Sequence, residues 1–348
     1  MRITEIQSAG LRHHTPAGGW TNKSWSIAVG GKAGALDHSS MSVLDSGRVI
    51  AMTAISRRSL LNMLPAILMA SNARRGFPAP KKVIVGAHPW VYAANQPHND
   101  ITPILESIFE DMSYAGMDAI ELMDNALRPE DSVSRIRDLS QKYRLPVLGT
   151  SYGANLWKRE DHEAILKEIT VVIERLSKLG GRTLGTSVGN AGSPKTPEQL
   201  DAQAEVLRRI IAISDDNGVV LNLHNHIYEV ADNEHDLKGT IQRIPTVKLG
   251  PDLDWLRGAG VDPLDFIHRY GNRIVFAHLR DRKADGKWSE AMGEGNTDFA
   301  SIGKSLHELN FSGDLVIELA HPAGLQLTRP LRDSLKMSRS FVRDVMGY

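Results

Sequence analysis

The stretch LNLHNHIYE at residues 221–229 is the part of the chain from which the fold can be inferred. It continues an apolar run that begins at Gly218, and it places His224 and His226 two residues apart. In a β-strand, residues at that spacing share one face, so both imidazoles are expected to point the same way where the strand ends. Two inward-pointing imidazoles at a strand end are typical of a metal or substrate site.

Three later apolar runs also end in a side chain that can bind a metal. Asp252, His278 and Glu318 close the runs 247–252, 274–278 and 315–318. A lone strand-end histidine is more often a hydrogen-bonded structural residue, but the carboxyl ends of parallel barrel strands meet at one face. We therefore expect the four strand ends to converge on one metal ion.

Apolar runs alternate with amphipathic stretches from Lys81 to the end of the chain. Strands are expected at 83–86, 119–122, 145–149, 183–186, 218–223, 247–252, 274–278 and 315–318, and the clearest helices at 101–115, 162–179, 197–217 and 331–345. Eight strand–helix units of this size predict an α/β fold, a (β/α)8 TIM barrel over residues 81–348. A doubly wound sheet is the competing fold, but the chain lacks the glycine-rich phosphate turn of nucleotide-binding sheets.

The first 80 residues differ from the rest. Residues 1–51 are rich in Gly, Ser and Ala without helical or strand periodicity, which predicts a poorly ordered N-terminal extension. Residues 52–80 resemble a twin-arginine export signal and linker, with paired arginines at 57–58 and a short apolar run at 64–70. We expect translation to begin at Met52 and the protein to be exported to the periplasm. An amphipathic helix with a basic start, in a cytoplasmic protein, is the alternative.

Composition narrows the possible partners. Lysine plus arginine equals aspartate plus glutamate at 41 each, so no net positive field draws in nucleic acid. The chain has no cysteine, which leaves histidine and carboxylate as its strong metal ligands. The apolar run at 64–70 is far shorter than the ~20 residues of a membrane span. A small-molecule substrate is therefore expected, and a homo-oligomer is left open.

Motifs in a fixed order connect the barrel to a known family. They are His224-Asn225-His226 with Glu229, residues 252–255 leading into 258–263, His278-Leu279-Arg280-Asp281, residues 293–299, and Val316-Ile317-Glu318. In this order and spacing, residues 81–348 resemble the sugar phosphate isomerase/epimerase family of xylose isomerase-like TIM barrels. The resemblance implies one divalent ion, Mn, Zn, Co or Mg, held by Glu, Asp, His and Glu from strands five to eight.

The implied ligands are Asp252, His278 and Glu318, which match the family pattern directly, and His224, which stands where many members have glutamate. Either the site is richer in nitrogen than usual, or Glu229 reaches in from the next turn. Asp252 could instead cap a helix, and Asp254 is expected to do so.

Other residues near the strand ends are candidates for catalysis or substrate binding. His226, Glu229, Arg280 and Glu121 are catalytic candidates, although Arg280 could be part of an exposed ion pair and Glu121 could be a structural partner of an arginine. His88, Trp90 and Trp255 are expected to line the pocket. Trp255 occupies the place where the family often has a histidine, which exchanges a proton-transfer group for an aromatic wall.

Such a site would act on a keto sugar or sugar derivative. A divalent ion polarises the substrate carbonyl, and a nearby carboxylate or imidazole removes the neighbouring proton to give an enediolate. Reprotonation gives an isomerase or epimerase, which is the principal prediction, whereas loss of a β-substituent gives a lyase on 3-keto-glycosides. A non-catalytic sugar-binding barrel is the alternative from another class. A nuclease of the endonuclease IV type would need more metal ligands and a basic surface.

Overall fold

The computed structural model describes residues 82–321 and 325–348. The predicted extension at 1–51 and the predicted signal and linker at 52–80 lie outside these residues. Within the described ranges, no helix combines the length and the apolar character needed to cross a membrane.

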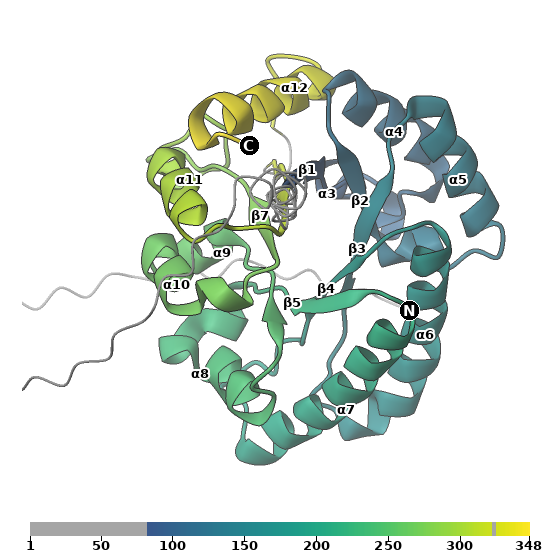
Figure 1. The fold of residues 1–348 in the computed structure, drawn as a ribbon, viewed down its shortest axis with the longest axis vertical. Helices are drawn as coiled ribbons and strands as arrows, with labels where there is room; N and C mark the ends of the chain where they lie inside the picture. The colour runs from purple at the N-terminus through teal and green to yellow at the C-terminus, as the bar shows by residue number, and fades with distance from the viewer. Residues whose placement is uncertain (1–81, 322–324) are drawn as a thin grey trace, which may run out of the picture. The chain divides into compact units, whose positions relative to one another are not determined.

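Eight parallel strands form the centre of the described part of the chain (Figure 1). The strands are β1 (Ile84–Ala87), β2 (Ala119–Met123), β3 (Val147–Gly153), β4 (Thr183–Ser187), β5 (Val220–Leu223), β6 (Lys248–Leu249), β7 (Phe276–Leu279) and β8 (Asp314–Ile317). Each strand pairs with its sequence neighbour from β1 to β6, and β8 pairs with both β7 and β1. This order confirms the predicted TIM barrel.

The seam between β6 and β7 closes the barrel differently from the other strand pairs. These strands meet through isolated parallel bridges, Leu249 with Ile274 and Asp252 with His278. Two backbone hydrogen bonds cross the seam, from Val275 N to Leu249 O at 3.0 Å and from His278 N to Pro251 O at 2.9 Å. The seam therefore runs directly between two of the predicted metal ligands.

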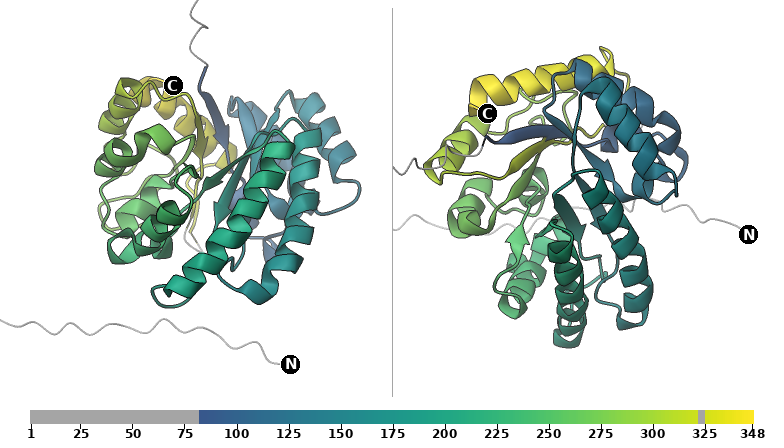
Figure 2. Two further views of the ribbon diagram at one scale, coloured as in Figure 1. Left: turned by 60° about the horizontal axis from the view of Figure 1, so that its bottom comes forward. Right: turned by 45° about the vertical axis from the view of Figure 1, so that its right-hand side comes forward.

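Helices surround the strands on the outside (Figure 2). They are α3 (Trp90–Ala93), α4 (Leu105–Tyr114), α5 (Ser132–Tyr143), α6 (His162–Lys178), α7 (Pro197–Asp216), α8 (Ile227–Arg243), α9 (Leu253–Gly258), α10 (Pro263–Tyr270), α11 (Phe299–Glu308) and α12 (Leu331–Phe341). Single turns complete the set: η1 (Pro97–Asn99), η2 (Thr102–Ile104), η3 (Asp124–Leu127), η4 (Arg159–Asp161), η5 (Gly271–Arg273) and η6 (Val342–Met346). The last helix, α12, packs against α4, which completes the ring.

Local sequence explains why the long helices form where they do. In α6, the residues Ile165, Ile169, Val172 and Leu176 recur every three or four positions and are buried, as an amphipathic helix on a sheet requires. Helix α7 begins at Pro197, and the Thr196 side chain accepts a hydrogen bond from Gln199 N. Such a capping box satisfies backbone donors that the first turn leaves free.

Helix α8 is interrupted near its start. Ala231 has extended backbone angles, and Asp232, Asn233 and Glu234 all have positive φ. Left-handed residues other than glycine are costly unless the surroundings hold them. Glu234 is held by ion pairs with Arg269 and Lys238, and Arg269 Nη2 lies 2.5 Å from its carboxylate. The first turn of α8 is thus set apart from the remainder of the helix, and it begins immediately after His226.

Candidate active site

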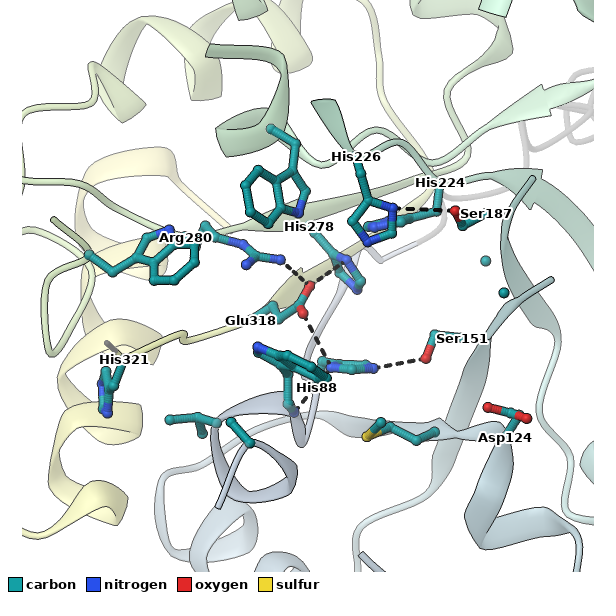
Figure 3. Close-up of a pocket in the computed structure, with 18 of the residues that line it drawn as sticks. His88, Asp124, Ser151, Ser187, His224, His226, His278, Arg280, Glu318 and His321 are labelled. Carbon is teal, nitrogen blue, oxygen red and sulfur yellow. Dashed lines mark hydrogen bonds and ion pairs between the residues drawn. The ribbon is translucent and has the colours of Figure 1, made fainter. Parts of the chain in front are cut away.

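A cavity of about 660 Å³ opens at the carboxyl ends of the barrel strands. Its wall includes six predicted functional residues that Figure 3 labels: His88, His224, His226, His278, Arg280 and Glu318. The predicted residues Trp90 and Trp255 line it as well. Three other predicted residues, Glu121, Glu229 and Asp252, are buried and do not form part of this wall.

Three of the four predicted metal ligands lie together. His224, Asp252 and His278 each offer a ligand atom, and these atoms are all within 4.8 Å of one another. Glu318 is outside that group, but its Oε2 lies 2.8 Å from His278 Nδ1. The structure thus places two imidazoles and one carboxylate around one point, with a second carboxylate beside it.

One donor atom in this group, His224 Nδ1, is buried without a hydrogen-bond partner among the described residues. His278 Nδ1 and Glu318 Oε2 face each other at 2.8 Å, and Arg280 Nη2 also lies 2.6 Å from Glu318 Oε2. Buried polar atoms are nearly always paired, because leaving one unpaired costs about 1–3 kcal/mol. His224, whose buried Nδ1 is unpaired, lies in one group with Asp252 and His278, so these residues fit a divalent metal.

Asp252 has a structural role in addition to its place in the cluster. Its Oδ1 accepts hydrogen bonds from Asp254 N at 2.9 Å and Trp255 N at 3.0 Å, so Asp252 caps α9. The prediction that Asp254 is the cap was wrong, because Asp254 lies inside α9 and binds the guanidinium of Arg282. Capping fixes the orientation of the Asp252 carboxylate before any ligand arrives.

Arg280 stands between the two carboxylates. Its Nη2 lies 2.6 Å from Asp252 Oδ2 and 2.6 Å from Glu318 Oε2, and the side chain is buried. The alternative of an exposed surface pair is therefore wrong. The guanidinium also lies over the Trp255 ring, 5.2 Å from its centroid. Such a contact gains an attraction between the cation and the ring.

His278 lies between two carboxylates. Its Nε2 is 2.6 Å from Glu121 Oε2, while its Nδ1 faces Glu318. Burial lowers the pKa of His278, but the two neighbouring carboxylates outweigh burial and raise it to about 10. Glu121 is therefore a partner of a histidine rather than of an arginine, and it lies behind His278 instead of at the cavity surface. A carboxylate behind a histidine fixes which ring nitrogen faces the ligand.

The formal charges around this cluster do not balance. Glu121, Asp252 and Glu318 are three carboxylates against the single guanidinium of Arg280, which leaves a formal charge of −2 while His278 is neutral. An uncompensated buried charge is strongly unfavourable. One divalent cation would balance the charge, whereas protonation of His278 balances only half of it.

The remaining histidines of the cavity differ in their surroundings. Burial, together with His278 and His226, holds the pKa of His224 well below its usual range, so its imidazole is neutral and able to bind a metal. His226 is more open, with its side chain 38% exposed compared with 8% for Glu318. The His226 Nδ1 lies 3.1 Å from Tyr228 Oη and 3.3 Å from Ser187 Oγ.

Glu229 is fully engaged by neighbouring hydrogen-bond donors. Its Oε1 accepts from Ser187 Oγ at 2.5 Å and from Val188 N at 3.2 Å, and its Oε2 accepts from His226 N at 2.6 Å. Glu229 is not among the grouped ligand atoms, so His224 is the strand-five residue that the structure offers to a metal. The contacts of Glu229 fix the backbone of the segment that carries His226.

Some residues of the cavity were not identified from the sequence. Ser187 was missed because β4 was expected to end at residue 186. Ser151 was missed because β3 was expected to end at residue 149, and its Oγ lies 3.0 Å from His88 Nε2. Trp288 lies in the loop after β7 and packs edge-on against Trp255, with ring centroids 5.8 Å apart. No local pattern marks that loop position as part of a binding wall.

Comparisons with known proteins agree with the fold. Residues 109–341 match the sequence model described as xylose isomerase-like TIM barrel. An inosose dehydratase from Clostridium beijerinckii is 23% identical over 289 residues, which are 72% of this chain and 94% of that protein. The solved structure of an L-ribulose 3-epimerase has a TM-score of 0.64 at 19% identity and covers 76% of this chain and 95% of its own. A 3-keto-D-glucoside 4-epimerase from E. coli has a TM-score of 0.56 at 18% identity and covers 74% of this chain and 100% of its own.

Proposed function

Because the chain belongs to the xylose isomerase-like TIM barrel family, we propose that it is a divalent-metal-dependent isomerase or epimerase of a keto sugar or sugar derivative. The observation that carries the proposal is the group of ligand atoms on His224, Asp252 and His278, which all lie within 4.8 Å of one another. The buried Nδ1 of His224 has no hydrogen-bond partner among the described residues. The imbalance of formal charge around the same residues also favours a divalent cation. The names of the similar proteins, two epimerases and a dehydratase, support chemistry on small sugars.

The residues that would hold the ion are His224, Asp252 and His278, with Glu318 beside them. A divalent ion polarises a substrate carbonyl and acidifies the neighbouring C–H bond. The protein prepares the ligands for this role, since the cap of α9 orients Asp252 and Glu121 orients the ring of His278. A neutral His224 requires no loss of a proton before it binds.

Two side chains in the cavity wall are suited to move the substrate proton. Although burial opposes it, Arg280, His278 and His88 hold the pKa of Glu318 well below its usual range, so Glu318 is an ionised carboxylate in the cavity wall. His226 is an imidazole with hydroxyl groups of Tyr228 and Ser187 next to its Nδ1. An epimerase needs a proton-transfer group on each face of the substrate, and Glu318 and His226 are our candidates.

A lyase is the second candidate function. The similar inosose dehydratase removes water, as its name states, and a dehydration is an elimination. The same proton abstraction followed by loss of a β-substituent would make this chain a lyase on a 3-keto-glycoside.

We also propose that residues 52–73 direct export through the twin-arginine route, which N-terminal sequencing of the native periplasmic protein tests.

The metal site is tested by elemental analysis of the full chain purified without added metal. We expect about one divalent ion per wild-type chain and its loss in His224→Ala. His321→Ala is the matched control, because His321 lines the same cavity but is not one of the grouped ligand residues. A metal-free wild-type protein, even after dialysis against Mn, Zn or Co, would contradict the proposal and favour a sugar-binding barrel.

The reaction is tested by incubating the metal-loaded protein with keto sugars and 3-keto-glycosides in D2O. Proton abstraction next to the carbonyl exchanges that hydrogen for deuterium, which NMR detects whichever product forms. The products then separate isomerase, epimerase and lyase. Absence of exchange with every substrate, in a protein that holds its metal, would contradict the proposed chemistry.

A further inference from the structure

Two leucines line the cavity without packing into the hydrophobic core. Leu325 and Leu327 follow β8 and remain 38% and 44% exposed. Neither is a member of the core clusters formed by the described residues. Exposed apolar side chains that line a concave site are typical of binding surfaces rather than of folding cores.

Polar contacts hold this leucine-bearing segment in place. Thr328, next to Leu327, donates its backbone N–H to Glu290 Oε1 at 2.9 Å and its hydroxyl to Glu290 Oε2 at 3.0 Å. Arg329 adds an ion pair with Glu294, 2.5 Å from Nη2 to Oε1. The loop after β7 therefore braces the loop after β8 and keeps Leu325 and Leu327 at the cavity.

The polar and charged groups proposed for metal binding and proton transfer lie together in this cavity. Figure 3 shows His224, His226, His278, Arg280 and Glu318 gathered together, with His321, which follows β8 as the two leucines do, apart from them. The cavity volume of about 660 Å³ is that of roughly 20 water molecules at about 30 Å³ each. One sugar ring at the charged groups would leave space beside the leucines.

We propose that Leu325 and Leu327 form a subsite for the aglycone of a 3-keto-glycoside, so that the substrate is a keto-glycoside rather than a free keto sugar. The inference rests on the proposed function, because it assumes that the sugar ring binds at the charged groups. A free sugar carries hydroxyls on all sides and would leave both leucines uncovered. An apolar aglycone would cover them and gain the free energy of burying apolar surface.

The two subsites are continuous within one cavity, which favours a single ligand that spans both. The sugar end has an aromatic wall, since Trp255 lies against His226 with ring centroids 5.9 Å apart. The aglycone end offers the aliphatic side chains of Leu325 and Leu327, and the charged groups next to this segment are paired with one another, since Arg329 forms ion pairs with Glu290 and Glu294. An uncharged apolar group therefore fits that end better than a phosphate or a carboxylate.

The test compares the binding of phenyl 3-keto-β-D-glucoside and methyl 3-keto-β-D-glucoside to the full chain by calorimetry. We expect the phenyl glycoside to bind the wild type at least about tenfold more tightly, a difference of about 1.4 kcal/mol. Leu325→Ser and Leu327→Ser should reduce that ratio several-fold. Leu309→Ser is the control, because Leu309 is also 38% exposed but lies outside the cavity wall.

Equal binding of the two glycosides, no saturable binding of the phenyl glycoside, or a ratio unchanged in both cavity variants would overturn the inference. Metal content measured on the same samples separates this result from the proposed function. A metal-loaded protein without discrimination refutes the subsite alone. A metal-free protein that still prefers the phenyl glycoside refutes the metal-dependent function and leaves the subsite standing.

Discussion

Removing the carboxylate of Glu229 should destabilise the barrel substantially, although Glu229 does not line the cavity. Its oxygens accept hydrogen bonds from Ser187 Oγ, Val188 N and His226 N. In Glu229→Ala, the Ser187 hydroxyl can turn to Tyr228 Oη, 3.0 Å away, and loses little. The two backbone N–H groups have no such alternative among their described neighbours. At about 1.5–3 kcal/mol for each hydrogen bond to a charged group, we expect a loss of about 3–6 kcal/mol in the free energy of unfolding.

Urea denaturation in the presence of a chelator measures this loss without a contribution from bound metal. Glu205→Ala is the matched control, because Glu205 forms an ion pair with Arg159 in which both side chains are exposed. We expect less than about 1 kcal/mol for the control. Glu229→Gln should fall between the two, since its amide oxygen retains part of the accepting capacity. A Glu229→Ala protein as stable as the control would refute the view that Glu229 fixes this segment.

Three further predictions concern other parts of the structure. Asp236→Ala should lower the free energy of unfolding, measured by urea denaturation, by about 3–5 kcal/mol, because it leaves the buried Lys195 ammonium without the carboxylate 2.5 Å away. A loss below about 1 kcal/mol would contradict this. Burial raises the pKa of Glu234, but the ion pair with Arg269 outweighs burial and holds this pKa below its ordinary value. The stability advantage of wild type over Glu234→Gln should therefore be full above about pH 5 and shrink as the pH falls below about 4. An advantage that grows on acidification would contradict this. His224→Glu should shift the preference in competitive metal binding from Zn or Co towards Mn or Mg, because an oxygen ligand replaces a nitrogen; an unchanged preference would argue that residue 224 is not a ligand.

Much of the fold could be predicted from local patterns. The apolar runs that end at Asp252, His278 and Glu318 alternate with amphipathic helices, and the number of strand–helix units favours a parallel barrel over a doubly wound sheet. Strand ends were less certain. The runs of β3 and β4 continue into Ser151 and Ser187, and a polar residue at a strand end has the same local signal as the first residue of a loop.

Contacts across the barrel could not be predicted. The sequence marks Glu121 and His278 as strand residues, but their 2.6 Å contact depends on how strands far apart in the chain are staggered. Arg280 was predicted as a catalytic candidate with an exposed ion pair as the alternative, and arginine is rarely buried. It is buried here because two carboxylates, on Asp252 and Glu318, lie close enough to pair with it.

The seam between β6 and β7 has a mechanical consequence. Asp252 and His278 form one of the isolated bridges that join these strands, so two of the residues offered to a metal sit on either side of a junction that has no continuous strand pairing. An ion bound by both would tie the strands together at that junction. Amide hydrogen exchange near Val275 and His278 would then slow when metal is added, and cation binding would regulate the local opening of the barrel wall.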